Sequence, residues 1–241
     1  MTTLKVNAIE PEGATTNLTV GMTGQNVVVG GSGGIKANTF KDAGGNTLWT
    51  SNGSGVLSSV SGFGGAQVLI SSQTASNSAS LSFTSGLTST YKEYVFEFIN
   101  INPATNSQHF GFQVNASGES GYNETITSTF FRAYNFENDA ARALDYLTAT
   151  DQAQGTAAQQ LFTSAGNDAD KSCVGELHLF NPASTTYVKN FYATTNGCQD
   201  GAVTQNEFAA GYINVTAAIT AIQFAMSSGN FDGKIKMYGV K

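Results

Sequence analysis

The chain has 241 residues, of which 40% are hydrophobic and 12% charged, and it includes 16 Phe, 9 Tyr and 1 Trp. This composition excludes a fully disordered chain, which would be richer in charge and poorer in aromatic residues. The net charge of −6 and the lack of a basic cluster argue against nucleic acid or an anionic membrane surface as a partner. No apolar stretch approaches about 18 residues. Residues 1–10 lack the pattern of a secretory signal, so we expect the protein to stay in its compartment or leave by cell lysis.

Residues 1–65 differ in composition from the rest of the chain. They contain 14 of the 27 Gly but only three aromatic residues, Phe40, Trp49 and Phe63, and their charges cancel. Strand-like segments alternate with Gly, Asp and Asn turns, the strands at residues 4–9, 18–20, 27–29, 35–40 and 48–49, the turns at 30–34 and 42–46. Such a region buries too little surface to fold alone. Either it is a flexible leader or it packs against identical segments of other subunits, and its low charge favours the second interpretation.

Residues 66–241 alternate repeatedly between apolar and polar side chains, which is typical of strands with one buried face. The predicted inward positions are Tyr94, Phe96, Phe98, Phe110, Phe112, Val114, Leu177, Leu179, Ile222, Phe224, Met226, Ile235 and Met237. Further strands are expected within 66–72, 79–84, 125–135, 186–194 and 208–216. About nine strands without regular helical spacers predict an all-β head at 66–241, an antiparallel sandwich of jelly-roll type.

One helix interrupts this expected pattern. Either Asn138 or Asp139 is placed to cap it, and its apolar positions at helical spacing are Ala140, Ala143, Leu144 and Leu147. The polar residues 148–155 that follow are expected to form a loop.

Several short patterns resemble catalytic or metal sites, and each has a simpler interpretation. Residues 30–34 (GGSGG) match the G-x-S-x-G elbow, but the sequence after them continues the strand-turn pattern where this elbow requires a helix, and no α/β layering is expected. His109 and His178 each lie on the polar face of an alternating strand, where ordinary solvent-facing histidines occur, and no spacing supports a shared metal site. We therefore predict no catalytic, cofactor-binding or metal-ligating residue, and no cofactor.

The acids and cysteines give no clearer signal. Residues 167–170 (NDAD), followed by Glu176, do not fit the register of a calcium loop and are better interpreted as a solvated turn. A glycan-cleaving enzyme needs a pair of carboxylates, which the sequence alone does not identify. Cys173 and Cys198 are too few for a disulfide framework, so both free thiols and a single bridge stay open.

Three segments carry a family resemblance. Residues 3–11 (TLKVNAIEP) and 41–49 (KDAGGNTLW), the latter followed by SNGSG, resemble the N-terminal parts of tail-fibre-like virion proteins of tailed bacteriophages. Residues 229–240 (GNFDGKIKMYGV) resemble the closing strand of their β-sandwich heads. Proteins related to this family serve either as tail fibres or as decorations on the capsid surface.

The resemblance implies a homotrimer with an extended N-terminal stalk at 1–65, which contacts other tail or capsid proteins, and C-terminal heads at 66–241. The expected function is that of a short tail fibre or spike in the virion, made in the bacterial cytoplasm, whose head binds a host-surface glycan or protein. The close alternative is capsid decoration, because the chain lacks a long repetitive shaft. A glycan depolymerase and a free-standing sugar-binding module are the remaining alternatives.

Overall fold

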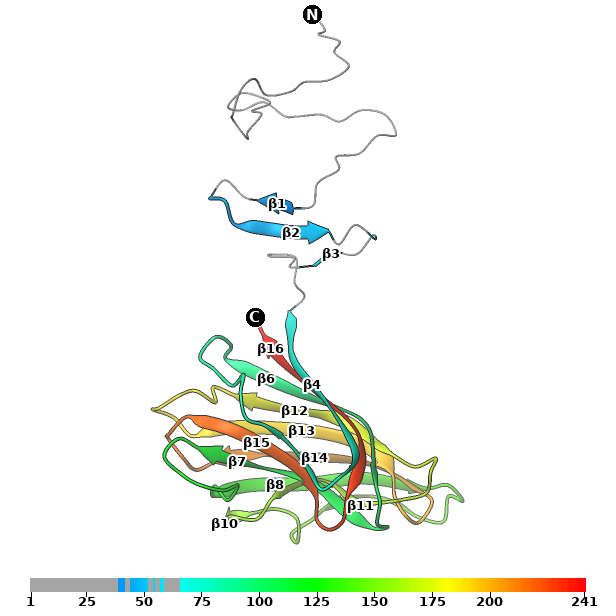
Figure 1. Ribbon diagram of the computed structural model, residues 1–241. Coiled ribbons are helices and arrows are strands. Elements are labelled where there is room, and N and C mark those ends of the chain that lie inside the picture. Colours follow the sequence, from blue (N-terminus) through cyan, green and yellow to red (C-terminus); the bar gives the residue numbers. More distant parts are fainter. Residues whose placement is uncertain (1–38, 42–43, 52–53, 55–56, 59–65) are drawn as a thin grey trace, which may run out of the picture. The chain divides into compact units, whose positions relative to one another are not determined.

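The computed structural model describes residues 39–41, 44–51, 54, 57–58 and 66–241. The chain divides into two units, Met1–Phe63 and Gly64–Lys241, which are described separately. The strands are β1 (Thr39–Lys41), β2 (Thr47–Ser51), β3 (Leu57–Ser58), β4 (Gln67–Ser78), β5 (Ser80–Phe83), β6 (Glu93–Pro103), β7 (Gln108–Ala116), β8 (Ile126–Phe136), β9 (Arg142–Tyr146), β10 (Ala153–Gly155), β11 (Gln159–Ala165), β12 (Cys173–Phe180), β13 (Lys189–Cys198), β14 (Val203–Ile213), β15 (Ile219–Met226) and β16 (Phe231–Val240) (Figure 1). The described residues contain no helix.

The first unit contains a small antiparallel sheet in the order β1-β2-β3. Phe40 and Trp49 are cross-strand partners, and their rings stack with centroids 4.0 Å apart. Gly45 has a φ of 82° in the turn between these strands, a conformation that glycine adopts without steric cost. Residues 39–40, the described part of the strand predicted at 35–40, and residues 48–49 are therefore in strands as predicted, while residues 35–38 lie outside the described part of the chain. The strands and the G-x-S-x-G match predicted before residue 35 lie outside the described residues.

The second unit consists of two antiparallel sheets that enclose one core. The large sheet has nine strands in the order β10-β8-β14-β13-β12-β6-β16-β4, with β9 paired to β8, and the small sheet has the order β11-β7-β15-β5. The first and last strands of this unit pair with each other, with Gln67 opposite Val240. The predicted all-β, antiparallel architecture is confirmed, and the two layers are consistent with a β-sandwich.

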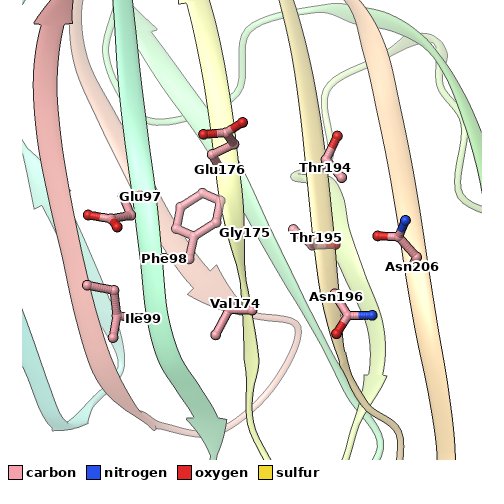
Figure 2. Close-up of a pocket in the computed structure, with 10 residues that line it drawn as sticks. All are labelled: Glu97, Phe98, Ile99, Val174, Gly175, Glu176, Thr194, Thr195, Asn196 and Asn206. Atoms are coloured by element: carbon pink, nitrogen blue, oxygen red, sulfur yellow. The ribbon is translucent and has the colours of Figure 1, made fainter. Parts of the chain in front are cut away.

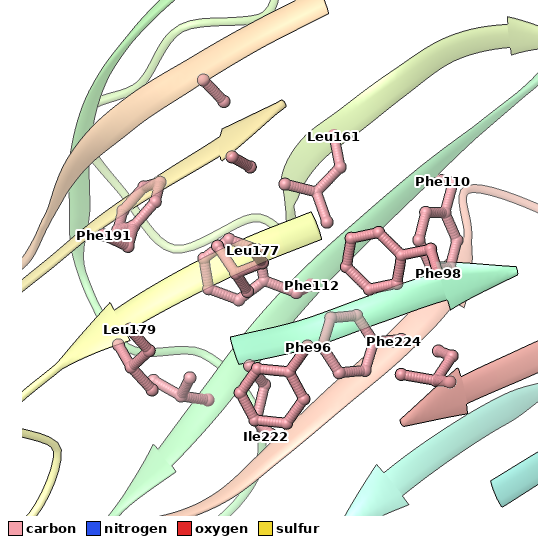
Figure 3. Packing of buried hydrophobic residues seen from close by; sticks show 14 of the residues in the cluster. Phe96, Phe98, Phe110, Phe112, Leu161, Leu177, Leu179, Phe191, Ile222 and Phe224 are labelled. Atoms are coloured by element: carbon pink, nitrogen blue, oxygen red, sulfur yellow. The ribbon is translucent and has the colours of Figure 1, made fainter. Parts of the chain in front are cut away.

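Aromatic side chains from both sheets form the core (Figure 3). Phe224 on β15 lies at its centre, with ring centroids 5.3 Å from both Phe96 and Phe98 on β6 and 6.0 Å from Phe110 on β7. Phe112 meets Phe191 edge to face at 5.1 Å. All of the inward positions predicted from alternation are buried. The core is confirmed because period-two alternation reports directly which side chains share a face of a strand.

The predicted helix over residues 138–147 is wrong. Its C-terminal half is strand β9, which pairs with β8, and its start is a hairpin turn in which Asn138 Oδ1 accepts a hydrogen bond from Ala140 N. Asp139 occupies the left-handed region at a φ of 56°. The same Asx residues that cap helices also make such turns. Leu144, which was expected on the buried face of the helix, is 73% exposed.

Two other strands of the second unit lie outside the predicted ones. The segment expected to be a loop at 148–155 ends in strand β10, which pairs with β8 at Ile126 and Thr127. Strand β11 includes two buried polar residues, Gln159 and Thr163, among its buried apolar ones, so the apolar alternation along it is interrupted. Both side chains are hydrogen-bonded within the unit, Gln159 Oε1 accepting from Ser128 Oγ and Thr163 Oγ1 donating to Glu207, so their burial leaves no polar group unpaired.

Candidate functional site

The side chains of the large sheet that point away from the small sheet form a surface that we call the outer face. Cross-strand register places five of them in one row across five adjacent strands. Glu97 on β6 is opposite Glu176 on β12, which is opposite Thr194 on β13. Thr194 is opposite Phe208 on β14, and Phe208 is opposite Phe131 on β8. The row brings together residues from distant parts of the sequence on a rigid support.

A shallow depression of about 440 Å³, the central hollow, lies on this face (Figure 2). It is lined by residues of β6, β12, β13 and β14, namely Glu97, Phe98, Ile99, Val174, Gly175, Glu176, Thr194, Thr195, Asn196 and Asn206. Glu97 on β6 and Glu176 on β12 lie side by side, Val174 and Gly175 lie next to Glu176 along β12, and Thr194, Asn196 and Asn206 lie on β13 and β14. The hollow therefore has carboxylates along one wall and hydroxyl and amide groups along the opposite wall.

The backbone explains why the sheet is hollowed here. Strand β6 has a β-bulge, with one extra residue relative to both neighbouring strands. Two residues apart on β12, Cys173 and Gly175, pair with residues three apart on β6, Ile101 and Phe98, and the pairing of β16 with β6 also gains one residue on β6. Asn100 within this bulge has a φ of 51°. Bulges bend strands and re-aim side chains, and they occur often beside functional sites. At Gly175 a Cβ atom would lie 2.3 Å from the Thr194 carbonyl oxygen, so a side chain is excluded from the floor.

A second depression of about 280 Å³, the side hollow, continues from the central hollow because Asn196 and Asn206 line both. Its other lining residues are Ala133, Tyr134, Asn135 and Thr204. The Phe131 and Phe208 rings stack beside it, with centroids 4.8 Å apart and an interplanar angle of 11°. The two hollows and this stacked pair form one continuous polar and aromatic surface.

The two glutamates of the central hollow have different partners. Glu97 Oε2 accepts hydrogen bonds from Lys236 Nζ at 3.1 Å and from Tyr238 Oη at 3.2 Å. The bond to Glu97 raises the pKa of Lys236. Glu176 Oε1 lies 3.3 Å from His178 Nε2. Because like charges directly opposite on adjacent strands repel, the Glu97 and Glu176 pair is unfavourable for the free protein.

His178 lies on the polar face of its strand, as predicted, but it is not solvent-facing. Its side chain is 11% exposed, and Nδ1 lies 2.5 Å from Glu93 Oε1. Its ring stacks on Tyr192 with centroids 4.3 Å apart. Burial, and then the charges of Glu93 and Glu176, raise the pKa of Tyr192. The expectation was wrong because cross-strand neighbours on the outer face are large enough to cover the imidazole.

His109 lies on β7 of the small sheet, so the two histidines belong to different sheets. Its Nδ1 accepts a hydrogen bond from Ser164 N at 3.1 Å, and burial lowers its pKa. Within the part of the chain that the structure describes, no group of three or more His, Cys, Asp or Glu side chains is placed to hold a metal ion.

The remaining candidates from the sequence have structural roles. Asp168, in the turn at residues 167–170, pairs with Lys171 Nζ at 2.7 Å, and Asn102 Nδ2 donates to the Asp168 carbonyl at 3.1 Å. Glu176 is separate from this turn and belongs to the outer face. Cys173 and Cys198 are both free thiols, and burial raises the pKa of Cys173.

A buried polar group that the sequence did not indicate joins the two sheets. Glu207 on β14 is 1% exposed, and its carboxylate accepts hydrogen bonds from the Thr163 backbone N at 2.7 Å and from Thr163 Oγ1. Burial raises the pKa of Glu207 to about 7, although these bonds and the charge of Arg132 act in the opposite direction. Gln205 Nε2 donates to the Thr163 carbonyl at 2.9 Å. Side chains of the large sheet thus satisfy the free edge of β11.

Comparison with protein-family models, with curated proteins and with solved structures found no match to this chain. The stretches covered by the structure include no helix of the length and apolarity needed to cross a membrane.

Proposed function

We propose that this chain is a non-catalytic structural protein of a tailed-bacteriophage virion. In this proposal it forms a homotrimeric short tail fibre or spike that attaches through residues 1–65. A jelly-roll-like head at 66–241 presents its outer face to the host surface. The observation that carries the proposal is the outer face itself, where aromatic rings and hydrogen-bonding side chains gather on strands that an apolar core supports from behind.

The exposure of large side chains on this face supports a binding role. Leu144 and Tyr146 on β9 are 73% and 52% exposed, and Phe131 on β8 is 40% exposed. Phe131 is the cross-strand partner of Tyr146, so these residues adjoin one another. Contiguous apolar surface on a soluble protein usually marks an interaction site. Tyr and other aromatic residues are also enriched where binding energy concentrates.

A binding role is favoured over hydrolysis because of the surroundings of the two carboxylates. A glycosidase of the usual type keeps one carboxyl group protonated by an apolar environment. The side chains of Glu97 and Glu176 are 44% and 51% exposed, which is the setting of solvated acceptors. Release of reducing sugar from host envelope that is lost in Glu176→Gln would establish the depolymerase alternative instead.

Capsid decoration is the second candidate function. The exposed Leu144 and Tyr146 lie on β9, a short strand paired only to β8, where a neighbouring virion subunit has direct access. A decoration protein clamps neighbouring subunits through such surfaces and needs no long shaft.

Copy number in purified particles tests the proposal. Quantitative mass spectrometry is expected to find a few dozen copies or fewer for a tail fibre or spike, and hundreds for a decoration protein. Light scattering of the purified chain is expected to give about three times 25.1 kDa. Absence of the chain from particles would refute the virion proposal.

A further inference from the structure

We propose that the central and side hollows bind a neutral glycan of several sugar units. Glu97 and Glu176 accept hydrogen bonds from its hydroxyl groups, and the exposed Phe131 ring, which Phe208 supports by stacking, contacts a sugar ring. This inference rests on the proposed function only in that a host surface supplies the glycan. The site itself is defined by the geometry of the outer face.

The carboxylate pair provides two hydrogen-bond acceptors for the glycan. Glu97 and Glu176 are direct cross-strand partners, so two acceptors lie side by side at one end of the central hollow. Ionised carboxylates accept hydrogen bonds only, and such charge-assisted bonds are stronger than neutral ones. Adjacent hydroxyl groups of a sugar donate to both and reduce the mutual repulsion. The ligand thereby recovers energy that the free protein loses in placing like charges opposite each other.

Thr194, Asn196 and Asn206 on β13 and β14, the amide wall of the hollow, provide further hydrogen-bond donors and acceptors. Asn196 Nδ2 donates to the Gln205 carbonyl at 2.9 Å, which fixes the orientation of the Asn196 side chain. Its Oδ1 is then a further acceptor for a ligand in the hollow. Thr194 and Asn206 lie beside it, and each offers both a donor and an acceptor. A polyhydroxyl ligand, whose hydroxyls both donate and accept, matches this mixture. The exposed side chain of Val174 on the floor gives the ligand an apolar contact.

The aromatic pair sets the length of the ligand. Phe131 lies four strands away from Glu97 in the same cross-strand row, and strands lie about 4.8 Å apart, so the row spans about 19 Å. That distance exceeds a single sugar and fits an oligosaccharide. The Phe131 and Phe208 rings stack face to face, and the 40% exposed Phe131 ring offers an apolar contact to the C–H face of a pyranose ring.

Charge decides between neutral and charged glycans. Glu97, Glu176 and the neighbouring Glu93 carry negative charge on this face, against Lys236, which is already paired to Glu97, and Lys234, which lies opposite Ile99. Uronic acids, sialic acids and phosphates would be repelled. A simple cation is a weaker candidate, because Lys236 already occupies one of the two carboxylates and the opposite wall carries neutral amide groups.

Saturation-transfer NMR with the full chain tests the inference. The probes are maltohexaose, cellohexaose and a mannohexaose, with a hexamer of galacturonic acid as the anionic probe. We expect saturation transfer to at least one neutral hexasaccharide and none to the anionic one. Transfer to none of the neutral probes, or equal transfer to the galacturonate, would overturn the inference.

Variants locate the site. Glu176→Ala and Phe131→Ala are each expected to weaken binding of the responding probe at least tenfold. Glu119→Ala removes an exposed carboxylate from a loop beside the small sheet and is expected to leave binding unchanged. Circular dichroism of each variant checks that the head stays folded. Unchanged binding in both outer-face variants would also overturn the inference. Glycan binding by a chain that is absent from particles would instead refute the virion proposal and leave this site intact.

Discussion

The two faces of the large sheet use the same residue types for different purposes. On the inner face, Phe96 and Phe98 are fully enclosed and meet Phe224 from the small sheet. On the outer face, Phe131 and Phe208 stack on each other with Phe131 left partly exposed. One face of the sheet is therefore packed as core, and the other carries exposed aromatic surface. Alternation predicts which face a side chain is on, and only the opposite layer determines whether that face is core.

Matched truncations on the two faces give the largest expected contrast. Phe224→Ala is expected to destabilise the protein by about 3–5 kcal/mol, through lost burial and a residual cavity. Phe131→Ala, the same change on the outer face, is expected to cost less than about 1 kcal/mol because no enclosed cavity forms. Urea denaturation of both variants measures the difference. Equal losses would mean that the outer face is covered in the folded protein.

The buried Glu207 predicts that the stability of the second unit depends on pH. Burial raises its pKa from 4.5 to about 7 in the folded state, so between these values the folded protein holds a proton that the unfolded chain has released. The contribution of Glu207 to the free energy of unfolding is therefore fully present below about pH 4.5. It falls by about 3 kcal/mol as the pH rises to about 7.

Denaturation of Glu207→Gln across this range checks the prediction. Gln mimics the protonated acid, so this variant is expected to lose most of the decline with pH. If wild type and variant show the same pH profile, Glu207 is not the group responsible.

His178 sharpens the comparison because it is buried on the outer face. His178→Ala removes the contact with Glu93 and the stacking on Tyr192 and leaves the Glu93 carboxylate without this partner. We expect a loss of about 1–2 kcal/mol in the free energy of unfolding. Thermal melting of this variant beside Lys92→Ala, an exposed change in a nearby loop, measures it. A loss of stability equal to that of the control would mean that the contacts of His178 with Glu93 and Tyr192 do not stabilise the fold.

The smallest expected effect has the opposite sign. Glu176→Gln removes the repulsion with Glu97 while keeping the shape of the side chain, and it is expected to stabilise the protein by roughly 0.2–1 kcal/mol. The measurement is the melting temperature, with Glu119→Gln as the control. A gain in stability together with a loss of glycan binding is the signature of a binding site. A destabilised variant would show that the Glu176 carboxylate is needed for folding.

The sequence predicted the core because alternation reports a local property of each strand. It did not predict strand β9, where Asn138 and Leu144 fit both a capped helix and a hairpin. Strand β11 was missed because Gln159 and Thr163 are buried through hydrogen bonds.

The central hollow was not predicted because it depends on register. Glu97 and Glu176 become neighbours only through pairing between strands far apart in the chain, and the Asn100 bulge is an effect of that pairing. No local pattern in the sequence encodes either feature. The burial of His178 has the same origin, since Tyr192 and Glu93 reach it from the two adjacent strands.

The central claim is that the proposed contact with the host is made by the outer face of the large sheet. Adsorption of particles that carry the Phe131→Ala, Glu176→Ala double variant to host cells tests it most directly, with copy number per particle measured in the same preparation. The account predicts normal incorporation and a loss of adsorption of at least tenfold relative to wild type. Normal incorporation with unchanged adsorption would contradict it.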